Sequence, residues 1–326
     1  MLSALAFHAA ALLVALALDA LLGWPAWLYA RIGHPVSWLG RLIAAADCAC
    51  NREGAAFALR RAAGVAVALG VIGLAAGAGW GLAGLVAGLV PAGWPGVVLL
   101  GALCWPLLAA GSLHAHVAAV ARPLAAGDMA GARQAVAMIV GRDPDRLDAA
   151  GIARAAAESL AENTSDGVIA PLFWGLLFGL PGIAGYKAVN TLDSMIAYRT
   201  TRHRAFGWAA ARIDDAANLL PARLTGLFYA LASGRPWAAL RCMAADARHH
   251  RSPNAGWPEA AMAGALGIRL SGPRLYAEGM SQDRWLNGAA PDPVAADLAA
   301  ALALFGRVVG LAALGLALLA VGVGGI

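Results

Sequence analysis

Acidic, amide and basic side chains gather in the middle of this 326-residue chain, and their types suit chemistry on phosphates. Nine of the 19 acidic residues lie between Asp143 and Asp215. Mg²⁺ prefers carboxylates together with substrate phosphates, and basic side chains offset phosphate charge. This composition predicts a Mg²⁺–phosphate site, with residues 141–260 as the functional core.

Two glutamates share one face of a predicted helix over residues 152–162. Glu158 and Glu162 are four positions apart, which places their side chains together on a helix. Residues 163–167 read Asn-Thr-Ser-Asp-Gly, a composition typical of a turn. We therefore expect the helix to break there, with Asn163 and Asp166 in the turn.

The only lysine of the chain is Lys187, and every other basic residue counted with it is an arginine. On a helix, Lys187 shares one side with Asn190 and with Asp193 or Ser194. Lysine binds phosphate as a compact point charge, which makes Lys187 a candidate for stabilising phosphoryl charge. The alternative is a lysine whose long side chain reaches the membrane edge.

The adjacent carboxylates Asp214 and Asp215 form a second candidate cluster. Two such charges at a membrane face are costly unless a positive charge compensates them. A Mg²⁺ ion is one candidate for that charge, and ion pairs with Arg212 and Arg223 are the alternative.

Residues 251–259 form a polar, proline-rich loop. Its residues Ser252, Asn254 and Glu259 suit the binding of an anion and a purely structural turn equally well.

The composition of the whole chain is that of a membrane protein. Apolar residues make up 60% and charged residues 13%, against about 25% charged in soluble domains. Mean hydropathy is +0.67. These values exclude a disordered chain and argue against a soluble globule. The net charge is +5, but the arginines are spread along loops rather than clustered with aromatics, so we expect no nucleic-acid partner.

Gaps in the charges locate the membrane-spanning helices. The stretch from 62 to 121 has 60 residues without Asp, Glu, Lys or Arg, enough for two helices of about 20 residues each. The first 18 and the last 19 residues are also uncharged. We therefore predict four spans, at about 2–22, 63–90, 96–120 and 305–324.

The run 167–186 is uncharged and long enough to cross, but two prolines and five glycines interrupt it. A broken or re-entrant segment fits better, because membranes tolerate irregular backbone only where protein or a wet cavity satisfies it. Arginine-rich loops are expected on the cytoplasmic side. If the segments near 167–186 and 216–233 do not cross the membrane, every arginine-rich loop lies on that side. We predict an all-α polytopic integral membrane protein with a single domain over 1–326. It has about four full spans, broken or re-entrant buried helices, and cytoplasmic amphipathic helices.

Several ordered blocks resemble the CobD/CbiB family of cobalamin biosynthesis, the membrane-bound adenosylcobinamide-phosphate synthases. The resemblance runs from about residue 16 to residue 280 and is specific because the blocks are long. A G-x-x-x-x-G-K-[ST] phosphate loop is absent, which is compatible with a family that does not use one. The matching blocks are 19–25, 34–36, 40–43, 140–143, 158–171, 186–195, 206–215, 221–223 and 251–259.

The resemblance implies ATP-dependent amide ligation between adenosylcobyric acid and (R)-1-amino-2-propanol O-phosphate, or the free amine. ATP and Mg²⁺ are the implied cofactors, and the implied location is a bacterial inner (plasma) membrane with the active site facing the cytoplasm. The lipid bilayer is a further partner, and the oligomeric state is left open, a homo-oligomer included.

The candidate site residues fall into three sets. The catalytic candidates are Glu158, Glu162, Lys187, Asp193 and Asp214. The metal candidates are Glu162, Asp166, Asp193, Asp214 and Asp215. The candidates for binding substrate and phosphate are His34, Asn163, Asn190, Ser194, Arg199, Arg212, Arg223, Ser252, Asn254 and Glu259.

Two other functional classes fit the residues less well. A membrane-embedded transferase could use Asn190, Asp193 and the Asp214–Asp215 pair to hold a Mg²⁺–diphosphate substrate. A transporter could line a midplane site with broken helices. The transferase would need a prenyl diphosphate rather than ATP, and the transporter would form no covalent product.

Overall fold

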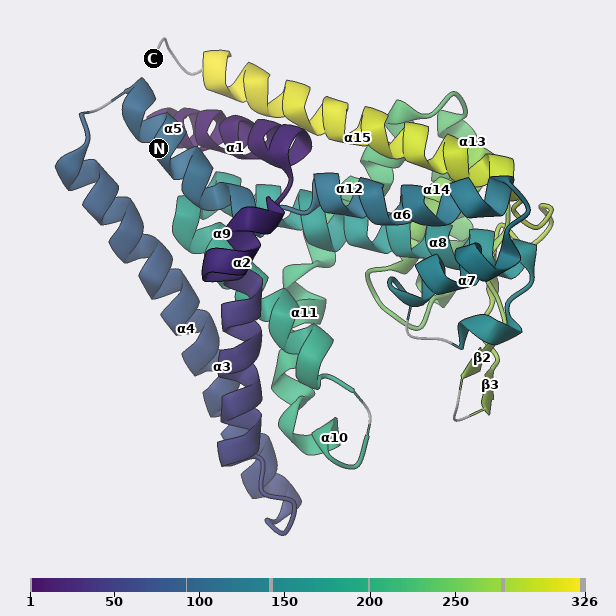
Figure 1. Cartoon of the computed structure of the whole chain (residues 1–326), viewed down its shortest axis with the longest axis horizontal. Coiled ribbons are helices and arrows are strands. Elements are labelled where there is room, and N and C mark those ends of the chain that lie inside the picture. The colour runs from purple at the N-terminus through teal and green to yellow at the C-terminus, as the bar shows by residue number, and fades with distance from the viewer. Residues whose placement is uncertain (1, 92, 141–142, 199, 277–278, 323–326) are drawn as a thin grey trace. The chain divides into compact units, whose positions relative to one another are not determined.

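The computed structural model describes residues 2–91, 93–140, 143–198, 200–276 and 279–322, and it is almost entirely helical (Figure 1). The chain forms two compact units, and each is assembled from separated stretches of sequence. Unit 1 contains residues 1–109, 170–218 and 313–326, and unit 2 contains residues 110–169 and 219–312.

Unit 1 is built from long apolar helices and the short helices that connect them. One further helix, α15 (Ala295–Gly322), has its C-terminal part in unit 1 and the rest in unit 2. The other helices of unit 1 are α1 (Leu2–Leu22), α2 (Ala26–Ile32), α3 (Pro35–Cys50), α4 (Phe57–Leu89), α5 (Trp94–Cys104), η1 (Trp105–Leu107), α9 (Ala170–Ile196), α10 (His203–Phe206) and α11 (Trp208–Ala217).

Unit 2 combines shorter helices with four short strands. Its helices are α6 (Ala110–Ala125), α7 (Met129–Ala137), η2 (Pro144–Arg146), α8 (Ala149–Thr164), the π-helix η3 (Ser165–Ile169), α12 (Leu219–Ala232), α13 (Pro236–Asp246), η4 (Ala247–His249) and α14 (Gly256–Leu266). Strand β1 (Leu270–Ser271) pairs antiparallel with β4 (Trp285–Leu286), and β2 (Arg274–Tyr276) pairs antiparallel with β3 (Gly279–Ser281).

Five helical stretches of the described residues are long and apolar enough to cross a membrane, namely Ala4–Leu22, Phe57–Leu89, Trp94–Ala125, Ala149–Ile196 and Ala295–Val321. Four of them overlap the four predicted spans, whose exact bounds stay a prediction, and the all-α polytopic membrane class is confirmed. The third is interrupted at η1, where Leu108 is extended. The fourth contains the segment 167–186, and whether it crosses the bilayer stays a prediction.

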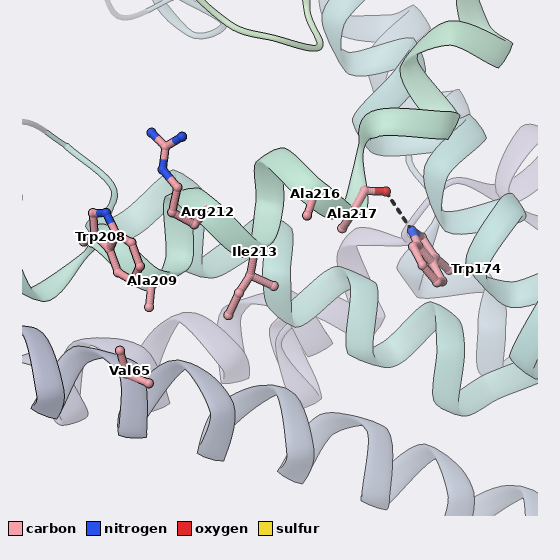
Figure 2. A pocket seen from close by; sticks show the side chains of 8 residues that line it. All are labelled: Val65, Trp174, Trp208, Ala209, Arg212, Ile213, Ala216 and Ala217. Atoms are coloured by element: carbon pink, nitrogen blue, oxygen red, sulfur yellow. Dashed lines mark hydrogen bonds between the residues drawn. The ribbon is translucent and has the colours of Figure 1, made fainter.

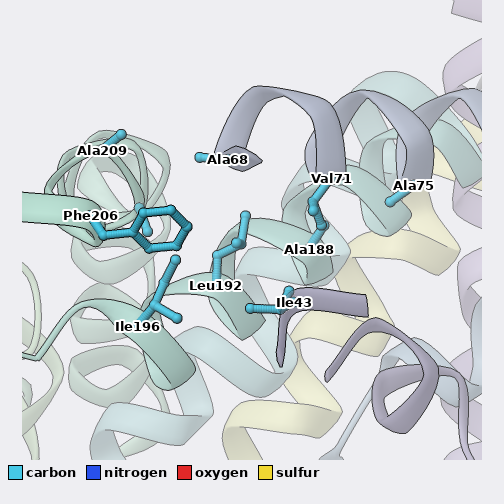
Figure 3. Close-up of a cluster of buried hydrophobic side chains, with 10 residues drawn as sticks. Ile43, Ala68, Val71, Ala75, Ala188, Leu192, Ile196, Phe206 and Ala209 are labelled. Carbon is cyan, nitrogen blue, oxygen red and sulfur yellow. The ribbon is translucent and has the colours of Figure 1, made fainter. Parts of the chain in front are cut away.

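One hydrophobic core cluster of unit 1 lies where α4 packs against α3, α9, α10 and α11 (Figure 3). Small residues on α4 allow this close approach, as is usual between membrane helices. A Cβ atom at Gly64 would lie 1.9 Å from the carbonyl oxygen of Phe206, and one at Gly79 would lie 2.8 Å from that of Leu180. Glycine at both positions therefore sets the separation of α4 from its neighbours.

Helix α9 is broken at Gly179, as the prolines and glycines of 167–186 predict. Gly179 has φ 65° and ψ −148°, a conformation that only glycine adopts without strain. Nδ1 of His8, from α1, lies 3.0 Å from the carbonyl oxygen of Leu176 near this break. A break of this kind can release carbonyl oxygens from the helix, and such oxygens need another polar partner when they are buried.

The predicted turn at 163–167 is wrong, because the chain continues through η3 as a π-helix without leaving the helical path. The Thr164 hydroxyl donates to the carbonyl oxygen of Leu160 at 2.6 Å and contacts the hydroxyl of Tyr229 at 2.7 Å. A hydroxyl that bonds back to its own helix competes with the backbone ladder. One widened turn results, a feature frequent at functional sites.

Candidate functional site

The predicted site residues divide between the two units. Unit 1 holds His34, Lys187, Asn190, Asp193, Ser194, Arg212, Asp214 and Asp215. Unit 2 holds Glu158, Glu162, Asn163, Asp166, Arg223, Ser252, Asn254 and Glu259. Arg199 lies outside the described residues.

His34 and Lys187, both in unit 1, are close enough for the lysine charge to act on the imidazole. Burial lowers the pKa of His34, and the nearby charge of Lys187 lowers it further. The His34 Nδ1 atom accepts a hydrogen bond from the backbone N–H of Val36 at 3.2 Å, which caps α3. Because Nδ1 is the acceptor, Nε2 carries the proton of the neutral ring. The N-terminal block and the lysine block of the sequence therefore meet at one place.

Hydrogen bonds tie the C-terminal end of α11 to α9. The Tyr186 hydroxyl donates to Oδ1 of Asn218 at 2.9 Å, and Nε1 of Trp174 donates to the carbonyl oxygen of Ala217 at 3.1 Å. These bonds fix the helix that carries Asp214 and Asp215. Arg212 pairs with Asp215 at 3.0 Å on the same helix. The ion pair offered as the alternative for this acidic cluster thus exists for Asp215.

The Ser194 hydroxyl group uses its proton in a hydrogen bond within its own helix. It donates to the carbonyl oxygen of Asn190 at 2.9 Å, within its own helix. Thr191 makes the same kind of bond to the carbonyl oxygen of Lys187 at 2.6 Å. The polar face of α9 predicted from Lys187, Asn190 and Asp193 is present, because all three side chains are partly exposed.

A pocket of about 540 Å³ lies against α11 in unit 1 (Figure 2). Its size falls within the range of small-molecule sites. Two tryptophans, Trp208 and Trp174, stand at its two ends. Arg212 is the charged residue of its lining, which also includes Val65, Ala209, Ile213, Ala216 and Ala217. Arg61 stacks over the Trp208 ring, 3.6 Å from its centroid.

Arg223 of unit 2 holds the loop 251–259 in place. Its guanidinium donates to the carbonyl oxygen of Leu219 at 2.6 Å and to Oδ1 of Asn254 at 3.5 Å. It also stacks over Trp257, 4.5 Å from the ring centroid. Ser252 Oγ accepts from the backbone N–H of Asn254 at 3.2 Å. Arg223, Ser252 and Asn254, predicted separately, therefore form one network.

That network continues through a histidine that the sequence did not single out. Nδ1 of His250 accepts from the backbone N–H of Ser252 at 3.1 Å. Its Nε2 lies 3.6 Å from Oε1 of Glu259, and the two side chains are only 5% and 2% exposed. The bond at Nδ1 leaves Nε2 as the protonated nitrogen, so a neutral His250 is oriented toward the Glu259 carboxylate. The adjacent residues His249 and His250 directly precede the loop 251–259, and no spacing to another polar residue distinguished them in the sequence.

Replacing Arg223 by lysine is expected to destabilise the protein by about 1–2 kcal/mol, although the charge is kept. Lysine has neither the planar fork nor the stacking surface that Asn254 and Trp257 contact. Thermal unfolding in detergent measures the effect. Arg248→Lys makes the same change at an exposed neighbour and should leave the unfolding temperature unchanged. Equal shifts in both variants would contradict the role given to Arg223.

Glu158 is buried in unit 2 and 4% exposed. Its Oε1 accepts from the backbone N–H of Ser271 at 2.7 Å, at a residue with φ 62°. One helical turn earlier, Arg154 pairs with Asp292 and stacks over Trp285. Glu162, four positions after Glu158, is exposed. The expected shared face is therefore real, but the two carboxylates differ in environment.

The predicted metal ligands are divided in the same way. Glu162 and Asp166 belong to unit 2, whereas Asp193, Asp214 and Asp215 belong to unit 1. Among the described residues, no group of three or more His, Cys, Asp or Glu side chains is arranged to hold a metal ion. Mg²⁺ bound with substrate phosphates needs only one or two protein carboxylates, so the metal assignment stays a prediction.

A polar network at the end of α3 was not predicted. Asp47 accepts from the Arg202 guanidinium at 2.7 Å and from Nδ2 of Asn51 at 2.7 Å, and it lies 3.5 Å from Nε2 of His203. Arg60 donates to Oδ1 of Asn51 at 2.9 Å and to the carbonyl oxygen of Arg202. The network holds residues 200–203 against α3 and α4. Its members are far apart in sequence, so spacing could not reveal it.

Asp47 should make the stability of the protein depend on pH. Burial alone would raise its pKa, but hydrogen bonds from Asn51, Arg202 and His203 lower it overall. A lowered pKa stabilises the fold above the unfolded value of about 3.9, and this is lost as pH falls through the folded value. The unfolding temperature of the wild type should therefore drop more steeply in acid than that of Asp47→Asn.

The control for this pH series is Glu53→Gln, which removes a carboxylate 70% exposed that pairs with the same Arg202. Exposed ion pairs contribute little, so this variant should follow the wild-type curve. If the unfolding temperatures of the wild type and Asp47→Asn fell in parallel from pH 7 to below the folded pKa, the lowered pKa assigned to Asp47 would be contradicted.

Comparison with known proteins identifies the family. The family model described as CobD/Cbib protein matches residues 12–305. A Rhodobacter capsulatus protein named "Cobalamin biosynthesis protein CobD" is 63% identical over 92% of this chain and 93% of its own length. Proteins of the same name from Brucella suis biovar 1 and Rhizobium meliloti are 46% and 44% identical, each over 90% of this chain and 90% and 91% of their own. No solved structure matches the chain significantly. The chain belongs to the CobD/CbiB family.

Proposed function

We propose that the chain is an ATP-dependent amide ligase of cobalamin biosynthesis. It joins adenosylcobyric acid to (R)-1-amino-2-propanol O-phosphate, giving adenosylcobinamide phosphate, or to the free aminopropanol, giving adenosylcobinamide. The observation that carries the pathway is 63% identity to a relative whose name is "Cobalamin biosynthesis protein CobD". The reaction itself follows from the family resemblance and from the residue types at the candidate site.

The chemistry begins with a carboxylate that is a poor electrophile. Transfer of the γ-phosphoryl group of ATP to a carboxylate oxygen gives an acyl phosphate and ADP. The amine then attacks the carbonyl carbon and expels phosphate as the amide bond forms. Glu158 is our candidate for the base that accepts the proton from the attacking ammonium.

Cationic and amide side chains position the reactants. Lys187 and Arg223, with Arg199, stabilise the charge that develops on the transferred phosphoryl group. Asn163, Asn190 and Asn254 orient the substrates. His34, whose imidazole feels the charge of Lys187, donates from its protonated Nε2 to a substrate oxygen. Arg212, Ser252 and Glu259 complete the binding surface.

The acidic residues supply the oxygen ligands that a hard cation requires. Asp193, Asp214 and Asp215 are partly exposed on α9 and α11, and Glu162 and Asp166 are accessible on α8 and η3. Some of these five would hold Mg²⁺, whose charge would neutralise the phosphates of ATP. Since ATP is cytoplasmic, we place the active site on the cytoplasmic side of a bacterial inner membrane, which the multi-pass chain crosses.

The test uses the full chain purified in detergent with adenosylcobyric acid, aminopropanol phosphate, ATP and Mg²⁺. Mass spectrometry detects the amide, and a coupled assay follows ADP. We expect one ADP for each amide and no amide when any component is omitted. Folded protein that forms no amide with either amine would overturn the proposal. Product from a prenyl diphosphate, or uptake without covalent change, would identify the transferase or the transporter instead.

A further inference from the structure

We propose that the pocket along α11, called here the α11 groove, binds one anionic phospholipid of the surrounding bilayer. The groove is the pocket between Trp208 and Trp174 described above. One acyl chain occupies the groove, and the headgroup phosphate lies at the Trp208 end. The groove shares Arg212 with the binding surface of the proposed ligase, but lipid retention is measured without ATP or corrinoid, so the two proposals can fail separately.

The walls of the groove suit a hydrocarbon chain. They are formed by α11, by Val65 of α4 and by Trp174 of α9. In Figure 2, Ile213 points from α11 toward α4, whereas the Arg212 guanidinium points away from α4. An apolar surface of this kind suits a hydrocarbon chain better than water. A water-soluble ligand would find few polar groups along its length.

The length and direction of the groove match one leaflet. Helix α11 has 10 residues and is therefore about 15 Å long, which is half of the roughly 30 Å hydrocarbon core. It packs against α4, a long helix that carries no charge after Arg61. A groove that extends along such a helix is long enough for much of one extended acyl chain.

One end of the groove lies at the membrane boundary. Helix α4 begins with Phe57, and after Arg60 and Arg61 it carries no further charge. Arg61 stacks over Trp208 at 3.6 Å, a pairing of two residues that both prefer the interface. Val65 lies one turn farther along α4. The Trp208 end is therefore the headgroup end, and the Trp174 end is deeper.

The charge at the headgroup end favours an anion. Two guanidinium groups, those of Arg61 and Arg212, flank Trp208, and the Asp215 carboxylate pairs with the second. The Arg212 side chain is still 58% exposed, so it can bind a phosphate while it contacts Asp215. Arginines near a membrane surface attract anionic lipids, so this pair selects phosphatidylglycerol over phosphatidylcholine.

The experiment measures phospholipid retained by the full chain. Protein purified in detergent is incubated with equal amounts of dioleoyl phosphatidylglycerol and dioleoyl phosphatidylcholine, and native mass spectrometry counts the bound lipids. We expect the wild type to keep one phosphatidylglycerol. Ala216→Trp fills the groove and should lower that occupancy roughly tenfold. Ala66→Trp, an equal change at an exposed position of α4 outside the groove, should not.

A second variant leaves the groove open and tests the headgroup. Arg212→Gln should reduce the preference for phosphatidylglycerol about fivefold while a lipid remains bound. Equal retention by the wild type and Ala216→Trp, with unchanged elution and unfolding temperature, would overturn the site. An unchanged preference in Arg212→Gln would overturn its anionic selectivity. A weaker affinity of Ala216→Trp for adenosylcobyric acid at unchanged lipid retention would assign the groove to the substrate instead.

Discussion

Asp214→Asn is expected to lower the rate of amide formation by about 100-fold or more, because preorganised charge at a phosphoryl-transfer site carries effects of this size. Asparagine keeps the volume and one oxygen of the side chain but loses the negative charge that a cation requires. Helix α11 is anchored to α9 through Asn218 and Ala217, so the variant should insert and fold as the wild type does. Single-turnover assays with ADP detection separate loss of phosphoryl transfer from loss of amine attack.

The matched control is Asp128→Asn. Asp128 caps α7 by accepting from the backbone N–H of Gly131 at 2.9 Å, and asparagine caps a helix equally well. This variant makes the same chemical change and should retain full activity. Near-normal turnover in Asp214→Asn would remove this aspartate from the site, and we would then test Asp193→Asn in the same way.

The membrane-spanning helices could be predicted because a helix that crosses a bilayer needs about 20 consecutive residues that are mostly apolar. A stretch of that length without charged residues is easily seen in a sequence. The uncharged gap between Arg61 and Arg122 therefore located two helical stretches correctly. The break in α9 was also predictable, since prolines and glycines mark places where a helix ladder fails. The face shared by Lys187, Asn190 and Asp193 followed from helical periodicity alone.

Other features depend on contacts that no spacing encodes. Residues 163–167 have turn composition, but Thr164 bonds to Leu160 and Tyr229, and the chain stays helical. Asp47 and Arg202 meet only because α3 packs beside the loop after α9. His250 can be recognised as part of the loop network only in the structure, where it lies buried beside Glu259. Tertiary context decides each of these cases, so the sequence pattern was either misleading or silent.

Gly64→Ala is expected to destabilise the protein by about 2 kcal/mol or more, an effect at the upper end for a single methyl group. The added Cβ atom would lie 1.9 Å from the carbonyl oxygen of Phe206, and a backbone atom cannot rotate away as a side chain can. Helix α4 would have to shift away from α10, which would loosen the cluster around Phe206 and Ala68. Thermal inactivation in detergent, followed by size-exclusion chromatography, measures the loss.

Gly70→Ala provides the internal comparison, because it makes the same change on the same helix. A Cβ atom at Gly70 would meet no atom of the described residues within 4 Å. Alanine favours helix over glycine by up to about 1 kcal/mol, so this variant should be as stable as the wild type or more so. If Gly64→Ala were equally harmless, α4 could not be packed as closely as we describe.

The interleaving of the two units along the chain has a consequence for how the protein is made. Helices α6, α7 and α8 of unit 2 leave the ribosome before α9–α11 of unit 1, and their partners α12–α14 follow only afterwards. The part of α8 that packs against α14 therefore waits for about 90 further residues of synthesis at roughly 5–20 residues per second. Nascent chains would spend several seconds with this surface uncovered, so insertion factors that shield early helices should raise the yield more than in proteins whose units are contiguous.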